Sequence, residues 1–189
     1  MIRTDRENSN GGGTAILIKE NVKFETLVTN LTSASLEYTG IKVILENNKF
    51  LYIFSIYNNN QYNHTLNLDL QNLLNCVNTA RDQFIIGGDF NSKHINWKNN
   101  SNNFNGIQLN NFICAKWNIL KHCYSFLPTY VAGNRRSFLD YFLISNSLTV
   151  QYPHSSFNFL KTHEFESDHK AVELFIHMST KIENNDNIN

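Results

Sequence analysis

The stretch that decides how this chain is interpreted is Phe84-Ile85-Ile86-Gly87-Gly88-Asp89-Phe90-Asn91. The three apolar residues at its start predict a strand that is buried on both faces. The two glycines that follow allow the backbone to turn or to approach another segment closely. If the strand continues beyond them, its period of two places Asp89 and Asn91 on one face and Phe90 on the other.

Two interpretations of this strand end remain open. A carboxylate and a carboxamide side by side at the end of a buried strand suit a hard cation or a phosphate group. The same pair also fits a strand that ends in an Asx-type turn, because Asp and Asn favour such positions. Asp89 and Asn91 are therefore candidate site residues, and the rest of the chain must decide between the two interpretations.

Length and composition indicate a single folded domain. The 189 residues, 41% of them hydrophobic, are enough for one core that needs no disulfide or metal. We expect the domain to span residues 1–180 and the polar, Asn-rich tail at 181–189 to be disordered. The sixteen basic and sixteen acidic residues balance, whereas a strong nucleic-acid binder usually has a basic excess. Any attraction to phosphate must therefore come from a local cluster.

The cysteines and the apolar segments indicate the cellular compartment in which the chain is expected. Cys76, Cys114 and Cys123 are odd in number, lie far apart and form no CxxC pair, so we expect reduced, mostly packed residues in an intracellular protein. No segment reaches the apolar length of a membrane span, and the N-terminus has no signal-peptide core. We therefore expect no membrane partner.

The apolar pattern along the chain predicts alternating strands and helices. Leucines recur at helical spacing from Leu66 to Leu74, whereas the stretches on either side alternate or are continuously apolar. Three glycines lead flexibly into the first strand, which we expect to be buried, and residues 46–49 form a tight turn. The expected strands cover residues 14–18, 36–45, 50–57, 84–86, 137–144 and 171–176, and the expected helices cover residues 65–80 and 106–117. Such alternation is typical of a layered α/β domain.

A second informative feature is the carboxylate of Asp140 within the apolar stretch Ser137 to Ile144. Burying an unpaired carboxylate costs roughly several kcal/mol, so Asp140 requires a partner. Arg135 and Arg136 are close in sequence and offer a purely structural explanation. A histidine partner would instead indicate a functional site.

Ser167-Asp168-His169 supplies such a histidine, just before the last apolar strand. Histidine exchanges a proton near neutral pH, and a buried carboxylate that orients a histidine is the basis of catalytic His-Asp pairs. A single histidine is more often structural than catalytic. The catalytic interpretation gains support because Asp-x-Asn, a buried Asp and Asp-His occur together in this order.

These three motifs in this order resemble the endonuclease/exonuclease/phosphatase superfamily, which includes DNase I and the apurinic/apyrimidinic endonucleases. Tyr57 matches the superfamily tyrosine that ends an upstream strand. Finer details are similar to the endonuclease domains of non-LTR retrotransposons, especially the jockey-like group. The matching segments are Gly88–Asn91, Leu139–Phe142, Ser167–His169, Asp5-Arg6, Gly11–Ile18, Asp89–His94 with Trp97, Asn105-Gly106 and Pro128–Tyr130.

The resemblance implies an α/β four-layer sandwich of two mixed β-sheets flanked by helices. It implies metal-dependent phosphodiester hydrolysis, most plausibly DNA nicking, with Mg²⁺ as cofactor and Mn²⁺ as the alternative ion. DNA and a reverse transcriptase domain of a parent element would be the partners, and an enzyme that acts on genomic DNA would be nuclear. The implied catalytic residues are Asp89, Asn91, Asp140, His169 and Tyr57, the implied substrate-binding residues are Asn91, Lys93 and His94, and the implied metal ligands are Asp89, Asn91 and Asp168.

Two departures from the superfamily pattern shape the expectations. An Asn and a metal-binding Glu stand on the superfamily's first strands, upstream of the position that matches Met1, so the fold is expected to lack its first strand or strands and to leave an edge or a core face exposed. In addition, Asn59 stands where a proline usually follows the tyrosine. The alternative to an endonuclease is thus an inactive relic that keeps the fold. A phosphatase or sphingomyelinase is a further alternative, which the segments at Lys93, Trp97 and Pro128 disfavour.

Overall fold

The computed structural model describes residues 1–5, 12–27, 35–59, 63–155, 157 and 159–177. The predicted tail at 181–189 and Gly11 of the glycine triplet lie outside the described residues. The strands are β1 (Ile2–Thr4), β2 (Thr14–Ile16), β3 (Phe24–Thr26), β4 (Leu36–Ile44), β5 (Phe50–Asn58), β6 (Gln83–Asp89), β7 (Leu120–Ser125), β8 (Tyr130–Ala132), β9 (Arg135–Ser137), β10 (Asp140–Ser145), β11 (Phe159–His163) and β12 (Ala171–Glu173). The helices are α1 (Leu66–Asn75), α2 (Phe104–Ala115) and α3 (Asn146–Gln151), with short 3₁₀ helices η1 (Glu46–Asn48) and η2 (Ile95–Trp97).

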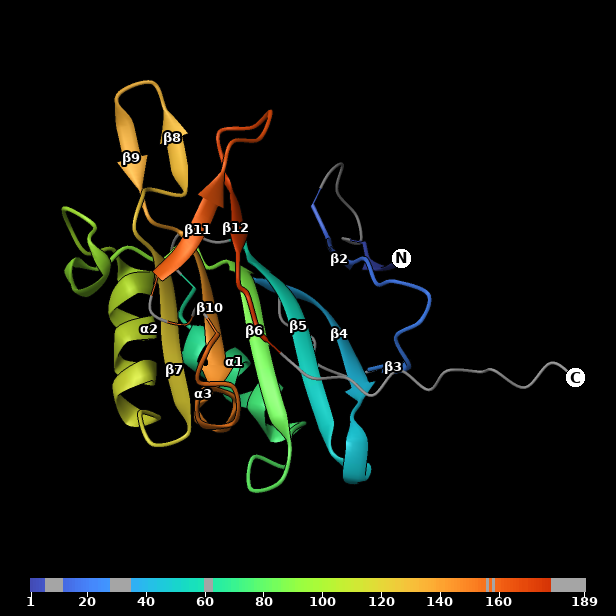
Figure 1. Cartoon of the computed structure of the whole chain (residues 1–189). Helices are drawn as coiled ribbons and strands as arrows, with labels where there is room; N and C mark the ends of the chain where they lie inside the picture. Colours follow the sequence, from blue (N-terminus) through green and yellow to red (C-terminus); the bar gives the residue numbers. More distant parts are fainter. Residues whose placement is uncertain (6–11, 28–34, 60–62, 156, 158, 178–189) are drawn as a thin grey trace, which may run out of the picture.

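Eight of the described strands form one curled, mixed sheet (Figure 1). Its order is β12-β11-β7-β10-β6-β5-β4-β3, so β5, β6 and β10 occupy the middle. β5 and β6 run parallel, whereas β6 and β10 run antiparallel. The hairpin β8–β9 projects beyond one end of the sheet, beside the loop between β11 and β12 (Figure 1). The chain is therefore a mixed α/β protein with few helices, as predicted and in keeping with the sandwich of the superfamily.

The larger core lies between the sheet and the helices α1 and α2. Alternate residues of β5, such as Phe54 and Ile56, meet the apolar stripe of α1, in which Leu66, Leu70 and Leu73 are fully buried. Burial of these leucines stabilises the fold by roughly 1.5–3 kcal/mol each. This packing fixes the end of β6, where Asp89 lies, relative to the rest of the sheet.

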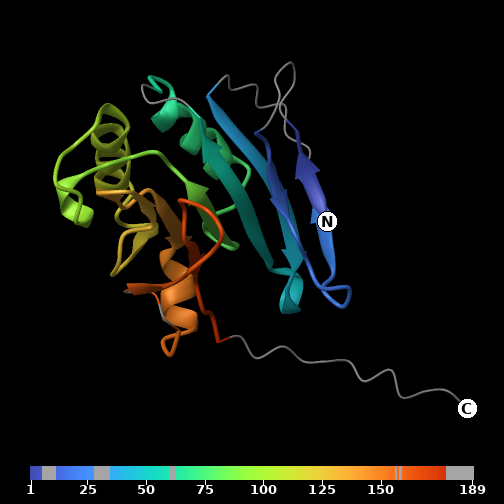
Figure 2. The same cartoon turned by 90° about the horizontal axis from the view of Figure 1, so that it is seen from above.

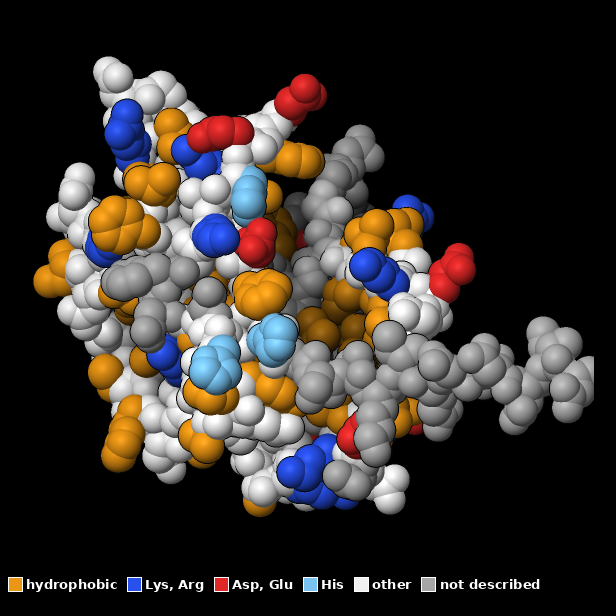
Figure 3. Space-filling view, in the orientation of Figure 1, with side chains coloured by type: hydrophobic (Ala, Val, Ile, Leu, Met, Phe, Trp, Pro, Cys, Tyr) orange, Lys and Arg blue, Asp and Glu red, His pale blue; other side chains and the backbone are white. Residues whose placement is uncertain are grey.

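Two segments of the chain cover parts of the opposite face of the sheet. The pair β1–β2 packs against β4 and β5 on this face, away from α1 (Figure 2). Residues 171–176 cover part of β6 and β10, and Val172 faces the sheet there. A cleft of about 480 Å³ lies between residues 171–176 and the sheet, with Ile53, Ile85 and Phe142 among its lining. Figure 3 shows recessed hydrophobic surface in this region.

Several sequence predictions are corrected by the structure. The strand expected at 14–18 is short and not buried, since Leu17 is 80% exposed where β2 ends. The first helix ends at Asn75 instead of residue 80, because the Asn78-Thr79 segment consists of weak helix formers and turns back toward β6. The strand expected at 137–144 is divided, with Ser137 in β9, Phe138 and Leu139 between the two strands, and residues 140–144 in β10.

The second helix also departs from its predicted bounds. It begins at Phe104, before Gly106, because the Asn103 side chain accepts a hydrogen bond from the Gly106 N–H at 2.7 Å and so caps the helix. It ends at Ala115, and Trp117 is 75% exposed instead of packing against the sheet. None of the helices in the described part of the chain has the length and apolar character to cross a membrane.

Candidate active site

The end of β6 is shaped by Gly88. This residue has a φ of +147°, and a Cβ atom added to it would lie 2.0 Å from the Ile56 carbonyl oxygen of β5. Only glycine permits this close approach of the two parallel strands. As a result Asp89 follows directly beside Tyr57 of β5, and the register pairs the two residues.

Asp89 also lies opposite a second carboxylate. The antiparallel register of β6 and β10 pairs Asp89 with Asp140, so that Tyr57, Asp89 and Asp140 form a row across three neighbouring strands. The side chains of Asp89 and Asp140 are 16% and 17% exposed. Burial, and secondly the nearby Asp140 charge, raise the pKa of Asp89 to about 7.

His169 lies between the two carboxylates. Its Nδ1 is 3.0 Å from Asp140 Oδ2, and its Nε2 is 4.0 Å from Asp89 Oδ2. The hydrogen bond to Asp140 raises the pKa of His169 above its ordinary value. The predicted contact between Asp140 and His169 is therefore present, and in the described part of the chain Asp140 forms no ion pair with Arg135 or Arg136.

Asn91 does not continue the strand, contrary to the prediction that Asp89 and Asn91 share a face by strand periodicity. Its φ is +48°, a left-handed conformation that Asn tolerates, and its N–H donates to Asp89 Oδ1 at 2.8 Å. Its side-chain amide donates to the Asn58 carbonyl at 2.8 Å. The Asx-type turn that the sequence left open is thus present, and it holds one oxygen of the Asp89 carboxylate in place.

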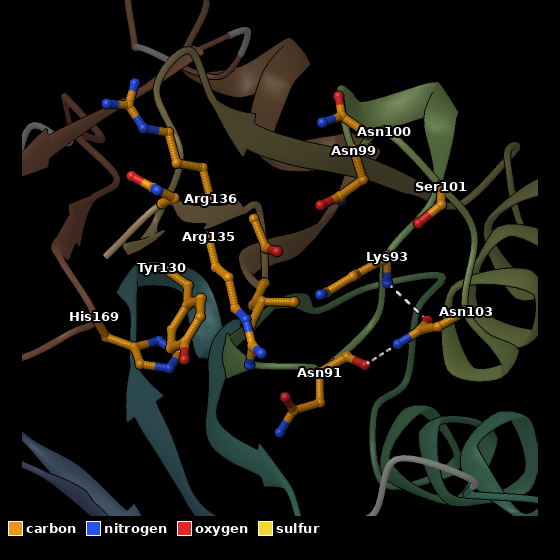
Figure 4. A pocket seen from close by; sticks show the side chains of 13 residues that line it. Asn91, Lys93, Asn99, Asn100, Ser101, Asn103, Tyr130, Arg135, Arg136 and His169 are labelled. Atoms are coloured by element: carbon orange, nitrogen blue, oxygen red, sulfur yellow. Dashed lines mark hydrogen bonds between the residues drawn. The ribbon is translucent and has the colours of Figure 1, made fainter. Parts of the chain in front are cut away.

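A groove of about 690 Å³ opens beside this row, between the loop after β6 and the hairpin β8–β9. In Figure 4, Lys93 and Arg135 point into the groove from opposite sides, while His169 and Tyr130 lie along one flank and Arg136 extends away. The polar residues that also line it are Asn91, Asn99, Asn100, Ser101, Asn103, Asn134 and Ser137. The groove is therefore polar, carries positive charge and ends at His169.

The remaining predicted site residues differ in their positions. Asp168 is exposed, next to His169, and its charge acts on both Asp89 and His169. His94 instead accepts a hydrogen bond from Asn96 N–H and stacks against Trp97, with ring centroids 4.9 Å apart. The structure thus gathers most of the predicted residues at one end of the sheet and places His94 in a capping role outside the groove.

Sequence reasoning did not identify the hairpin that forms one wall of the groove. Gly133-Asn134 between two short strands is a two-residue hairpin signal, and Gly133 has the left-handed φ of +57° that such turns require. A turn at Gly133-Asn134 implies that Arg135 begins the second strand of the hairpin. Tyr130 is paired with His169 through an isolated bridge, which no sequence signal reveals.

A divalent cation at this site would need several oxygen donors near Asp89. Within the described residues, Asp89, Asp140 and His169 meet, but no group of three or more His, Cys, Asp or Glu side chains has the arrangement of a metal-binding cluster. The raised pKa of Asp89 nevertheless marks a buried carboxylate whose negative charge lacks full compensation. Asp89, Asp168 and Asn91, supplemented by water, are compatible with Mg²⁺, which usually retains several waters and takes one or two carboxylates.

The curled mixed sheet thus carries Asp89, Asp140 and His169 together at one end. Residues 51–173 match the model of the family described as endonuclease-reverse transcriptase, and the chain belongs to that family. None of the curated protein sequences compared with the chain matches it.

Two solved structures are similar to the chain. The endonuclease domain of TRAS1, a telomere-specific non-LTR retrotransposon, superposes with a TM-score of 0.63 at 14% identity over 87% of this chain and 73% of that chain. An endonuclease/exonuclease/phosphatase family protein from Leptotrichia buccalis superposes with a TM-score of 0.57 at 18% identity over 82% of this chain and 60% of that chain. At these identities the similarity establishes the fold.

Proposed function

We propose that the chain is a DNA-nicking endonuclease domain, or part of one, from a non-LTR retrotransposon. The observation that carries the proposal is the line of Asp140, His169 and Asp89, in which the imidazole lies 3.0 Å from one carboxylate and 4.0 Å from the other. Membership of the endonuclease-reverse transcriptase family supports DNA as the substrate and a reverse transcriptase domain as the partner. Such an enzyme would act in the nucleus.

The side chains divide the chemistry between them. Asp89, with its pKa raised to about 7, positions the attacking water and accepts a proton from it near neutral pH. His169, whose pKa is raised by the hydrogen bond to Asp140, presents Nε2 to the reacting phosphate and stabilises the negative charge that develops on the phosphate oxygens. Asn91 and Tyr57 hold the phosphate beside Asp89. Asp140 orients His169 and does not contact the substrate.

A divalent cation fits this scheme as a cofactor. Asp89, Asp168 and Asn91 would hold it, with water in its remaining positions. When bound, the cation lowers the pKa of a water molecule that it coordinates and stabilises the negative charge on the phosphate oxygens. Nucleases of this superfamily generally use divalent metals, and Mg²⁺ is the ion that these oxygen donors suit best.

The groove offers a path for the substrate strand. Lys93 and Arg135 reach into it from opposite walls, and the asparagine amides along it can donate to phosphate oxygens. Local positive charge at this place is consistent with the neutral chain as a whole, since phosphate binding needs only a few basic side chains.

An inactive relic is the second candidate, and one observation favours it. Among the described residues, no group of three or more His, Cys, Asp or Glu side chains is arranged so that it could hold a metal ion. Supercoiled plasmid relaxation in Mg²⁺ distinguishes the candidates. Nicking by this chain or by a version extended at its N-terminus that is lost in Asp89→Ala supports the endonuclease, whereas absence of nicking by both versions would end the proposal and favour the relic.

The substrate that is hydrolysed distinguishes a phosphatase or sphingomyelinase from an endonuclease. The same preparations, incubated with a phosphomonoester and with sphingomyelin vesicles, should release no product above the Asp89→Ala control. Hydrolysis of either substrate in preference to plasmid DNA would contradict the assignment of DNA as the substrate.

A further inference from the structure

One buried threonine connects the segments that carry the candidate catalytic residues. Thr129, in the loop before β8, is 0% exposed. Its Oγ1 accepts hydrogen bonds from the N–H of Leu139 at 3.0 Å and from the N–H of Asp140 at 3.1 Å. Its carbonyl accepts a hydrogen bond from the Lys170 N–H at 2.7 Å, directly after His169. Both members of the His-Asp pair are therefore attached to the same residue.

The connection extends to the turn that carries Asp89. The N–H of Phe90 donates to the Leu139 carbonyl at 3.0 Å. Leu139 is thus held by two hydrogen bonds. Its carbonyl accepts from the Phe90 N–H, and its own N–H donates to Thr129 Oγ1. Asp89, Asp140 and His169, which lie far apart in the sequence, meet within this hydrogen-bond network.

The hairpin that walls the groove belongs to the same network. The Thr129 N–H donates to the Ser137 carbonyl at 3.0 Å, which closes the base of the hairpin. The Val131 N–H donates to the Asp168 carbonyl at 2.8 Å. The Tyr130 ring stands edge-on to the His169 imidazole with centroids 5.1 Å apart. A shift of the hairpin would therefore move His169.

We propose that Thr129 is a positioning residue, whose hydroxyl sets the distance of the Asp140 carboxylate from His169 and joins this pair to the groove hairpin. The inference rests on the proposed function, because it assigns Thr129 to the same site. The physical reason is that the two buried N–H groups at the start of β10 need an acceptor, and Thr129 Oγ1 supplies it for both. Thr129 does not line the groove, so it acts through Asp140 and His169 alone.

The test uses the full chain with three substitutions. Thr129→Val removes the hydroxyl and keeps the shape, Thr129→Ser keeps the hydroxyl, and Ser125→Ala removes another fully buried hydroxyl in the same region as a matched control. The readout is the NMR resonance of the His169 Nδ1 proton that is hydrogen-bonded to Asp140. We expect a slowly exchanging, downfield signal in the unmodified chain, in Thr129→Ser and in Ser125→Ala, and its loss in Thr129→Val.

Activity adds a second arm. In a chain that nicks DNA, Thr129→Val should lower kcat on the order of tenfold to a hundredfold and leave KM within about threefold, since misplacement of a catalytic group affects the reacting geometry and not the groove. If neither this chain nor a version extended at its N-terminus nicks DNA, the proposed function fails, while the NMR result still decides the role of Thr129. A folded Thr129→Val protein with an unchanged His169 signal would overturn the proposal.

If Thr129→Val does not fold, a measurement on the unmodified chain takes its place. Native-state hydrogen exchange of the Leu139, Asp140 and Lys170 amides then serves as the test. Exchange of the three amides with one common opening free energy supports the proposal, because they share Thr129. Exchange of Lys170 independently of Leu139 and Asp140 would overturn it.

Discussion

Asp89 and Asp140 lie directly opposite each other in the antiparallel pairing of β6 and β10. Like charges in this relationship are destabilising, and both side chains are more than four-fifths buried. The fold therefore maintains an unfavourable electrostatic arrangement at the end of its central strands. Such an arrangement is typical of functional sites, where pKa values are shifted by burial and by neighbouring charges.

The first prediction concerns Asp89 and pH in metal-free buffer. Because the pKa of Asp89 is raised from 3.8 to about 7, the protonated form favours the folded state. Its contribution to stability is present at low pH and lost as pH rises through about 7, with a slope of about 1.4 kcal/mol per pH unit between the unfolded and folded pKa values. Asp89→Asn should therefore gain stability relative to the unmodified chain between about pH 4 and pH 8 in urea unfolding. Parallel stability curves for the two proteins would contradict the raised pKa.

The second prediction concerns metal binding. At about pH 8, Mg²⁺ at ten times its Kd should stabilise the chain by about 1.4 kcal/mol, because it binds the ionised Asp89 of the folded state. Asp89→Asn should lose this effect. The control is Asp82→Asn. Asp82 is a buried residue that forms an ion pair with Arg81 and directly precedes β6, so this variant should still be stabilised by Mg²⁺. Thermal unfolding with and without Mg²⁺ is the measurement, and equal shifts in both variants would place the ion elsewhere.

The third prediction concerns the loop that carries Lys93. A Cβ atom added to Gly106 would lie 1.7 Å from the Lys93 carbonyl oxygen. Gly106→Ala gains about 1 kcal/mol of helix propensity. The clash should outweigh this gain, so we expect a net loss of about 1–3 kcal/mol. At Gly133, where no atom lies within 4 Å, substitution by Ala should cost only about 1 kcal/mol of left-handed strain. Stabilisation by Gly106→Ala in denaturant unfolding would contradict the tight packing of this loop on α2.

The fourth prediction concerns the groove. Lys93→Ala and Arg135→Ala should each weaken binding to duplex DNA and reduce the slope of log K against log salt by about 1, because each basic side chain that contacts a phosphate releases one counterion. Lys116→Ala, at the far end of α2, is the matched control and should change neither quantity. Fluorescence anisotropy over a series of salt concentrations provides the slopes. Unaltered slopes in the groove variants would exclude this groove as the DNA path.

Much of the fold follows from local patterns in the sequence. The strands β4, β5 and β6 and the start of α1 were predictable because their apolar residues repeat with the period of the element. The contact of Asp140 with His169 was predictable because a carboxylate in an apolar strand needs a partner.

Other features depend on tertiary contacts that no local pattern reveals. Asn91 leaves the strand because its N–H binds the Asp89 carboxylate and its side chain binds the Asn58 carbonyl. His94 turns from the groove because Trp97 offers its ring a stacking partner. The position of Asn91 reflects competition between local hydrogen bonds and strand periodicity, whereas that of His94 reflects side-chain packing.

The open cleft over β5, β6 and β10 bears on activity. An extra strand on this apolar face would cover Ile53, Ile85 and Phe142 and, if it carried the superfamily Asn and Glu, could bring another carboxylate toward Asp89. Such a carboxylate would raise metal affinity, and a covered face would help to hold the geometry that in-line attack requires. We therefore expect this chain to nick DNA slowly or not at all, and a version extended by such a strand to nick faster.

The most direct test of the account is supercoiled plasmid relaxation in Mg²⁺ by three proteins: this chain, a version extended at its N-terminus by a strand bearing the superfamily Asn and Glu, and Asp89→Ala in the extended version. The account predicts nicking by the extended version, little or none by this chain, and loss of nicking in Asp89→Ala. Brisk nicking by this chain would show that the Glu is dispensable here. Absence of nicking by the extended version would contradict the account and identify the chain as an inactive relic.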